Sequence, residues 1–178
     1  MSAQTRAVAD TAQEDSFDFE SFFHAHYERI ARVIARLIGD PARAEELAVE
    51  ALWKLWQNPR AHGDSAGGWL YRTAVRMGLN ELRSTVRRAR HESLAEPVAA
   101  FPSPEEVRAA AEEQRQVRQV LAALDPRQAG LLLLRSSGLS YQEVADAMEI
   151  NPASVGTLLS RAQEAFRKEY VKNYGTQR

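Results

Sequence analysis

The sequence contains no cysteine among its 178 residues, which excludes disulfides and thiolate metal sites. It has no apolar run approaching the roughly 20 residues that a membrane-spanning helix needs. Its N-terminus lacks a basic segment followed by an apolar one. We therefore expect no membrane insertion and a cytoplasmic location. The formal net charge of −1 excludes a strongly basic surface over the whole chain, so any face for nucleic acid has to be local.

Residues suited to catalysis are also scarce. The four histidines are scattered, and no pair of carboxylates stands at a recognisable catalytic spacing. The glycines fit neither the P-loop nor the dinucleotide-binding fingerprint. The sequence therefore predicts a binding protein and not an enzyme, with no metal and no cofactor.

The most informative segment, residues 139–162, has the pattern of two helices joined by a short turn. Ser140 and Glu143 have the spacing of a capping box at the start of the first helix. Asn151 and Pro152 are typical of the cap and first residue of the second helix. The exposed face of that second helix carries Ala153, Ser154, Gly156, Thr157, Ser160 and Arg161. This small, polar face suits a DNA major groove, so we interpret the segment as a helix-turn-helix; the alternative is an ordinary helical hairpin in an all-α core.

A long helix, predicted from about residue 65 to Arg90, carries the strongest charge asymmetry. Between Trp69 and His91 there are six arginines and one acidic residue, Glu81, which gives a local formal charge of +5. Aromatic rings stack on unpaired bases and guanidinium groups bind phosphates, so this composition favours single-stranded or melted nucleic acid. The alternative is a solvated basic helix end, which the helix dipole also favours.

The preceding helix, predicted over residues 41–57, has acids beside a pair of tryptophans. Its acidic residues are Glu45, Glu46 and Glu50, and Trp53 and Trp56 follow them. A row of acids is usually a solvated surface. Beside large aromatic residues it can also be a docking surface, because tryptophan is common among interface anchors.

Together these segments predict an all-α protein of two small helical domains joined by a flexible linker, the second ending in the helix-turn-helix. We expect a disordered tail over residues 1–16, because that segment is polar and rich in alanine. The first domain is expected over residues 17–91. Residues 92–103 contain two prolines and no periodicity, which is typical of a linker. The second domain is expected over residues 104–172, and we expect its end to fray from Tyr170 onward.

The order of these parts resembles the bacterial extracytoplasmic function (ECF) sigma factors, over about residues 18–168. The resemblance rests on three fragments. The first is Ala44-Glu45-Glu46-Leu47 through Leu52 and Trp56, and the second is Trp69-Leu70-Tyr71-Arg72-Thr73-Ala74 with Arg83. The third begins with Leu124-Asp125-Pro126-Arg127-Gln128 and continues with Gly138-Leu139-Ser140-Tyr141-Gln142-Glu143-Val144-Ala145, Val155 and Arg161-Ala162. In the family these correspond to a helix that docks on the polymerase clamp, a helix that melts the −10 element, and a domain that reads the −35 element.

The resemblance implies a sigma factor that binds core RNA polymerase at the β′ clamp and β flap and directs promoter recognition, DNA melting and transcription initiation. An anti-sigma factor is a further implied partner. The implied polymerase contacts are Glu46, Glu50, Leu52 and Trp56. The implied −10 contacts are His62, Trp69, Arg72, Arg76, Asn80, Arg83, Arg87 and Arg88, with capture of bases by the loop of residues 58–68. The implied −35 contacts are Ser140, Tyr141, Ser154, Thr157, Ser160 and Arg161.

The sequence departs from the family pattern at Glu46, Val49, Arg76 and Asn80, where the family usually has Asp, Gln, Asn and Asp. A basic residue common in the recognition helix is replaced by Gly156 or its neighbours. These departures leave an alternative open, in which a sigma-like regulatory protein binds polymerase or an anti-sigma factor without reading promoters. Another alternative is a conventional dimeric helix-turn-helix repressor, which gives the arginine-rich helix no role.

Overall fold

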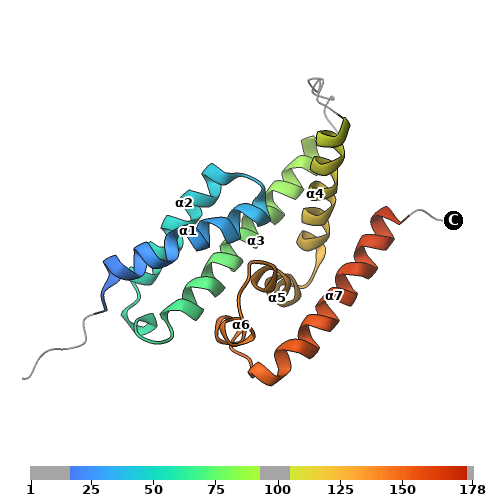
Figure 1. Ribbon diagram of the computed structural model, residues 1–178. Coiled ribbons are helices and arrows are strands. Elements are labelled where there is room, and N and C mark those ends of the chain that lie inside the picture. Colours follow the sequence, from blue (N-terminus) through green and yellow to red (C-terminus); the bar gives the residue numbers. More distant parts are fainter. Residues whose placement is uncertain (1–16, 93–104, 176–178) are drawn as a thin grey trace, which may run out of the picture.

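The computed structural model describes residues 17–92 and 105–175 (Figure 1). Its helices are α1 (Phe19–Ile38), α2 (Pro41–Trp56), the short 3-10 helix η1 (Pro59–Ala61), α3 (Ala66–Glu92), α4 (Glu105–Ala123), α5 (Pro126–Ser136), α6 (Tyr141–Met148) and α7 (Pro152–Tyr174). No strand occurs within the two described ranges, and the all-α fold class is confirmed. None of the helices there combines the length and apolarity needed to cross a bilayer. The expected tail, residues 1–16, and all but the first residue of the expected linker, 92–103, lie outside the described residues.

The boundaries of the first helices follow from short polar and glycine signals in the sequence. Asp18 caps α1 by accepting a hydrogen bond from the backbone N–H of Ser21, at 3.1 Å. Gly39 ends α1 with a φ of 76°, a left-handed conformation that glycine adopts without steric cost. Asp40 then caps α2 and Pro41 is its first residue. The chain therefore reverses within a few residues, and α1 and α2 pack side by side.

The helix-turn-helix caps form as the sequence predicts. The hydroxyl of Ser140 accepts from the N–H of Glu143 at 3.2 Å, and the Glu143 carboxylate accepts from the N–H of Ser140 at 2.7 Å. Asn151 caps α7 by accepting from the N–H of Ala153 at 2.9 Å. These bonds satisfy backbone donors that have no partner inside the helix, and they fix where α6 and α7 begin.

The two halves of the chain share one hydrophobic core. Helix α3 packs against α1 and α2 on one side and against α4, α5 and α6 on the other (Figure 1). A single cluster of buried side chains joins Ile34 of α1 and Leu79 of α3 to Leu134, Val144 and Leu159 of the second half. The sequence predicts the helices of each half but does not predict that α3 is the common partner of both halves.

Helix α7 continues to Tyr174, so the expectation of fraying from Tyr170 is wrong. The hydroxyl of Tyr170 donates to Oε1 of Gln116 on α4 at 3.0 Å, and Tyr174 makes the equivalent bond to Gln119. The two rings also contact each other along α7. The tyrosines therefore attach the last turns of α7 to α4. The polar composition of the segment does not predict this contact.

Candidate nucleic-acid interface

A cleft of about 810 Å³ lies where the loop before α3 and the start of α3 meet the end of α6. Its lining residues are Asn58, Arg60, Ala61, Asp64, Ser65, Gly68, Trp69, Arg72, Asp146 and Glu149. We call it the α3 cleft. The first eight residues belong to the loop and helix that the sequence assigns to −10 DNA, and the last two belong to the helix-turn-helix. The tertiary structure therefore places an acidic helix end beside the candidate strand-binding surface.

Two of the expected −10 residues have structural contacts in and near this cleft. Trp69 packs on a small cluster formed by Leu55, Ala61 and Ala66. Nε2 of His62 lies 3.0 Å from the carbonyl oxygen of Leu55, and its ring stacks on Phe17 at 4.4 Å. Both rings are half-buried, so they shape the loop and leave only part of their surface for a base.

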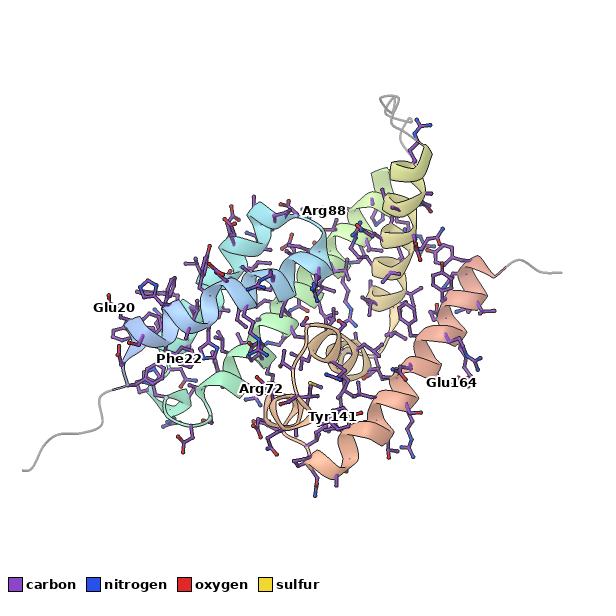
Figure 2. The ribbon with its side chains drawn as sticks, in the orientation of Figure 1. Glu20, Phe22, Arg72, Arg88, Tyr141 and Glu164 are labelled. Atoms are coloured by element: carbon purple, nitrogen blue, oxygen red, sulfur yellow. The ribbon has the colours of Figure 1, made fainter. Side chains whose placement is uncertain are left out.

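Arg72 points from α3 to α6 (Figure 2). Its Nη1 is 2.6 Å from Oε1 of Glu149, which stands at the C-terminal end of α6. The side chain of Arg72 is 35% exposed and that of Glu149 is 70% exposed. The ion pair is therefore accessible to solvent and to anionic ligands.

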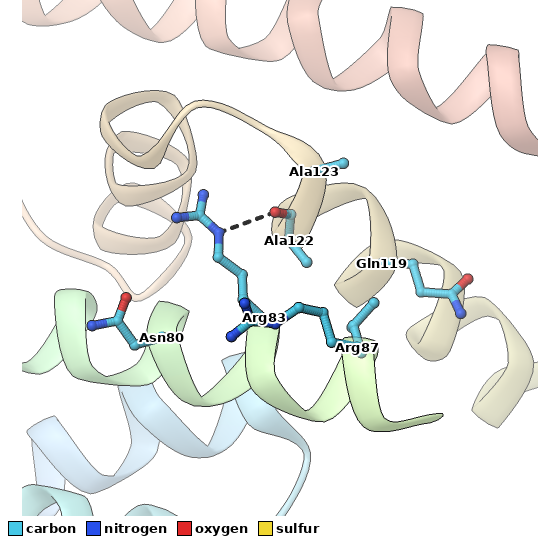
Figure 3. A pocket seen from close by; sticks show the side chains of 7 residues that line it. Asn80, Arg83, Arg87, Gln119, Ala122 and Ala123 are labelled. Atoms are coloured by element: carbon cyan, nitrogen blue, oxygen red, sulfur yellow. Dashed lines mark hydrogen bonds between the residues drawn. The ribbon is translucent and has the colours of Figure 1, made fainter. Parts of the chain in front are cut away.

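Arg83 also faces the second half of the chain, in a pocket of about 500 Å³ between α3 and α4 (Figure 3). Its Nε donates to the carbonyl oxygen of Ala122 at 3.1 Å, and its Nη2 donates to that of Leu124 at 2.9 Å. These carbonyls lie at the end of α4, where no further helical N–H reaches them. Arg83 therefore caps α4 in this conformation.

The remaining −10 candidates on α3 are exposed to solvent. They are Arg76, Asn80, Arg87 and Arg88. Arg88 lies 3.5 Å from Glu81 and 3.2 Å from the hydroxyl of Thr85, contacts that stay on the surface of α3. The charge of the arginine-rich helix is therefore split between side chains held at the other half and side chains open to a ligand.

The face of α7 expected to meet −35 DNA is open. Ser154, Thr157, Ser160 and Arg161 are all exposed, whereas Val155 and Leu159 on the opposite side are buried. Ser140 is exposed too, although its hydroxyl is engaged in the capping box. Helix α7 therefore has an exposed face of small polar residues and a buried apolar face, as the sequence predicts.

A second cation beside this face was not found from the sequence. The Arg135 guanidinium lies 5.6 Å from the ring centroid of Tyr141, a cation–π distance. A Cβ placed at Gly156 would lie 3.7 Å from that same ring. Tyr141 is 49% exposed and lies beside Gly156, which with its neighbours stands where the resemblance leads us to expect a basic side chain. Only the fold shows this neighbourhood, because Arg135 lies in a different helix from both Tyr141 and Gly156.

The α2 surface differs from the one expected. Leu52 is 0% exposed and belongs to the core, so its assignment as a polymerase contact is corrected: the side chain supports α2 from within. Glu46 and Glu50 stay on the surface, paired with Arg43 and Lys54 of the same helix. The large exposed apolar side chains of α2 are Val49 at 48%, Trp53 at 55% and Trp56 at 47%. Their spacing of four and three residues, visible in the sequence, defines one helical face.

Behind the start of α3, an ionic contact joins the two halves beside the half-buried ring of His26 and the buried ring of Tyr71. Arg29 of α1 is 3.1 Å from Glu143 of α6. Burial lowers the pKa of His26, as does the nearby positive charge of Arg29, and Glu143 opposes the shift. Burial likewise raises the pKa of Tyr71, whose ring lies 5.5 Å from the Arg29 guanidinium. Backbone and side-chain hydrogen bonds at Ser140 and the charge of Arg29 lower the pKa of Glu143.

Comparison with known families matches the two halves separately. Residues 22–88 match the model for sigma-70 region 2, and residues 114–165 match the model for sigma-70 region 4. The first match contains all of α2 and most of α1 and α3, and the second contains the helix-turn-helix. The fold and these two matches therefore define the class of helical transcription factors that carry sigma-70 regions 2 and 4 in one chain.

Several relatives match most of the chain. The ECF RNA polymerase sigma factor SigK of Mycolicibacterium vanbaalenii is 27% identical over 168 residues, covering 90% of this chain and 86% of its own. The RNA polymerase sigma-H factor of Pseudomonas aeruginosa is 28% identical over 167 residues, covering 86% of each chain. The sigma factor RpoE of Bartonella quintana, solved in complex with the anti-sigma factor NepR, shares the fold with a TM-score of 0.51 and 18% identity, over 85% of this chain and 96% of that one. The chain belongs to the ECF sigma factors.

Proposed function

We propose that this chain binds core RNA polymerase and directs it to promoters, where it recognises two DNA elements, melts one of them and starts transcription. The observation that carries the proposal is the presence, in one chain, of both sigma-70 regions with their expected surfaces open or partly open. An isolated helix-turn-helix repressor needs neither the region-2 half nor its arginines.

Polymerase docking at the β′ clamp is assigned to the exposed face of α2. Val49, Trp53 and Trp56 form an apolar strip, and Glu46 and Glu50 lie beside it. Large aromatic anchors surrounded by polar residues are the usual pattern of an interface that buries a few residues deeply. The strip replaces Leu52 in the set of contacts expected from the sequence.

Contact with the β flap is assigned to a groove of about 520 Å³ between α4, α5 and α7. The apolar side chains that line it are Val117, Leu121, Leu132, Leu133, Leu159 and Phe166. A groove of this composition accepts the apolar face of a helix.

Recognition of −10 DNA is assigned to the loop of residues 58–68 with α3, and −35 recognition to α7. Extracting a base from the duplex costs a few kcal/mol, which contacts in the α3 cleft and the arginines of α3 have to offset. The α7 face contributes polar side chains and Arg161, with Arg135 and Tyr141 beside it. Two modest DNA contacts suffice when both are tethered to one polymerase, because the second then binds at high effective concentration.

Reconstituted transcription tests this function. Purified protein is combined with core RNA polymerase and a library of random upstream DNA, and the transcripts are sequenced. Specific start sites that share two upstream elements are the expected result. Initiation no better than that of core polymerase alone contradicts the proposal.

A second candidate is a sigma-like regulator that binds polymerase or an anti-sigma factor without reading promoters. Arg76 and Asn80 favour it, because both are exposed on the promoter-melting helix and differ from the family pattern. The same transcription experiment separates the two, since the regulator binds polymerase without producing specific starts.

A further inference from the structure

The acidic end of α6 lies in the α3 cleft, among the residues assigned to −10 DNA. Asp146 and Glu149 line the cleft together with Trp69 and Arg72. Glu149 pairs with Arg72 at 2.6 Å (Figure 2). A carboxylate that faces an arginine of a DNA-binding surface occupies the position of a phosphate, because both present oxygen acceptors to the guanidinium fork.

Glu149 stands at a helix end with a left-handed backbone, a position that glycine usually occupies. Its φ is 52° and its ψ 51°, and it is the one residue other than glycine with a positive φ in the described chain. Glycine is the usual residue at such a helix end, because a Cβ costs free energy there. A carboxylate also repels the negative end of the helix dipole. The left-handed backbone and the repulsion by the helix dipole both disfavour a glutamate here, which indicates a compensating contact elsewhere. The contact that Glu149 makes is its ion pair with Arg72.

The backbone of α6 approaches α3 closely at Gly68. A Cβ built on Gly68 would lie 3.0 Å from both the carbonyl carbon and the carbonyl oxygen of Asp146. At the adjacent Gly67 the nearest atom to such a Cβ is Cε1 of His26, at 3.9 Å, an ordinary contact. Gly68 is therefore the position on α3 that lets the acidic helix end settle into the cleft.

Further polar contacts away from the cleft hold the two halves in the same arrangement. Arg29 pairs with Glu143 at 3.1 Å, and Nη1 of Arg36 donates to the carbonyl oxygen of Ser136 at 2.9 Å. Arg83 caps the end of α4 from α3. Polar contacts from both α1 and α3 thus keep the second half against the first.

This arrangement is incompatible with simultaneous binding of the two promoter elements. Elements centred about 25 base pairs apart are separated by roughly 85 Å along B-form DNA. In the structure α3 and α6 are in direct contact, and α6 is joined to α7 by a turn of three residues, Glu149 to Asn151. The −10 and −35 surfaces therefore have to move apart when the promoter is bound.

We propose that the acidic end of α6 is an internal competitor for the DNA strand at α3, so that the free protein masks its own −10 surface. The proposal rests on the proposed function. The masking is selective: the strip of Val49, Trp53 and Trp56 on α2 and the polar face of α7 remain exposed in the closed form. Polymerase therefore docks on the closed protein, and −10 capture follows departure of the helix-turn-helix.

Substitution of Glu149 tests the competition directly. Binding of a short fluorescent single-stranded DNA of mixed sequence is measured by anisotropy for Glu149→Gly, Glu149→Gln and the parent. Both variants are expected to bind about two- to fivefold more tightly, the range of a solvent-exposed ion pair. Glu149→Gly is also expected to melt at a higher temperature, because it relieves the left-handed backbone; tighter DNA binding together with greater stability is not the result of a damaged fold.

Matched variants control for charge and for helix propensity. Glu164→Gln makes the same charge change at an ion pair that stays within α7, 2.9 Å from Arg167, and is expected to leave DNA binding at the parent level. Gly68→Ala is expected to tighten DNA binding by pushing α6 away, whereas Gly67→Ala is not. Unchanged affinity in all the Glu149 and Gly68 variants overturns the proposal.

A reversible cross-link tests the closed form itself. Because the chain has no cysteine, Arg36→Cys and Ser136→Cys introduce the only two thiols. Both positions are exposed and lie outside the two DNA surfaces and the α2 strip, and Ser136 also lines the groove assigned to the β flap, so single-stranded DNA binding is the deciding measurement. A short bismaleimide with a cleavable disulfide joins them. Compared with the unlinked double variant, the linked protein is expected to bind single-stranded DNA more weakly and to lose initiation, and reductant is expected to restore both. The singly substituted Arg36→Cys protein, treated alike, is the control.

The two readouts separate this proposal from the proposed function. Equal DNA binding by the linked and unlinked proteins overturns the masking, whatever the transcription assay shows. If the unlinked protein binds polymerase and produces no specific starts, the promoter-reading function fails, and the anisotropy difference still decides whether α6 masks α3.

Discussion

Arg83 of α3 donates a hydrogen bond of 2.9 Å to the carbonyl oxygen of Leu124, 41 residues further along the chain. The sequence assigns Arg83 to DNA, and the fold assigns it to the end of α4. Arg83 thus has two possible partners: the end of α4 when the two halves are packed together, and DNA when they are apart. Arg87, one helical turn later, lines the same pocket but is exposed.

Removing these two arginines is therefore expected to have unequal effects. Arg87→Ala removes an exposed cation, so affinity for single-stranded DNA is expected to fall. The slope of log affinity against log salt then decreases by about 0.7 for each phosphate that the protein no longer neutralises. Arg83→Ala removes a cation and also loosens the packing of α3 on α4, so its net effect on affinity is smaller. Salt titrations followed by anisotropy measure both. Arg115→Ala, on the far part of α4, is the control; a decrease there as large as in Arg87→Ala contradicts the assignment.

The α2 surface gives a pair of neighbours with opposite expected effects. Leu52→Ala empties a fully buried site and is expected to lower the free energy of unfolding by about 2–5 kcal/mol. Trp53→Ala, at a site 55% exposed, is expected to change stability by about 0.5 kcal/mol or less. It is expected to weaken polymerase binding by about 1 kcal/mol or more, as an interface anchor does. Urea unfolding and pull-down with core polymerase distinguish them; a Trp53→Ala protein that binds polymerase normally removes the strip from the docking site.

The capping box sets the start of α6 and can be tested by stability alone. Ser140→Ala leaves the N–H of Glu143 without its acceptor and is expected to cost about 1 kcal/mol of unfolding free energy. Asn151→Ala, which removes the cap of α7, is expected to cost a similar amount. The midpoint of urea unfolding measures both. Midpoints equal to that of the parent would mean that these bonds contribute nothing to stability.

His26 is expected to make stability depend on pH below neutrality. Burial and Arg29 lower its folded-state pKa below the ordinary value of 6.5, although Glu143 opposes the shift. As pH falls below 6.5 the unfolded chain takes up the proton before the folded chain does, so the free energy of unfolding decreases. The contribution of neutral His26 to the free energy of unfolding is complete above pH 6.5 and is lost as the pH falls through the folded-state pKa. Urea unfolding between pH 7.5 and pH 5 is expected to show a weaker decline in His26→Gln; an identical decline assigns the dependence to other groups.

Arg135 is expected to contribute to −35 binding although it lies outside α7. Arg135→Gln removes the cation over Tyr141 and is expected to weaken binding to a duplex carrying the −35 element by about 1 kcal/mol or less, because the contact is exposed. Arg127→Gln, an exposed arginine at the start of the same helix, is the control. Equal binding by both variants and the parent removes Arg135 from this surface.

The elements that the sequence predicts well are those fixed by neighbouring residues. The capping box at Ser140 and the cap of α7 at Asn151 depend on residues within four positions, so the pattern contains the whole interaction. The polar face of α7 was predictable for the same reason, since helical periodicity alone separates Ser154 and Thr157 from Val155 and Leu159.

The errors arise where one face of a helix has two candidate partners. Leu52 fits a core residue and an interface anchor equally well, because an apolar side chain satisfies both patterns, and only the packing of α2 on α1 and α3 shows that it is buried. The exposed strip at Val49 and Trp53 has a recognisable spacing, but sequence alone does not say which apolar stripe of α2 faces the core.

Composition and short-range patterns were enough to predict the helices, their caps, the absence of thiol chemistry and the concentration of arginine on α3, since each depends on residue content or on residues close together in the chain. What those arginines meet became visible only in the folded molecule. The contacts of Arg72 with Glu149 and of Arg83 with Leu124 join segments that are 77 and 41 residues apart. No local pattern encodes such pairs, because they form only when burial of the shared core brings the two halves together.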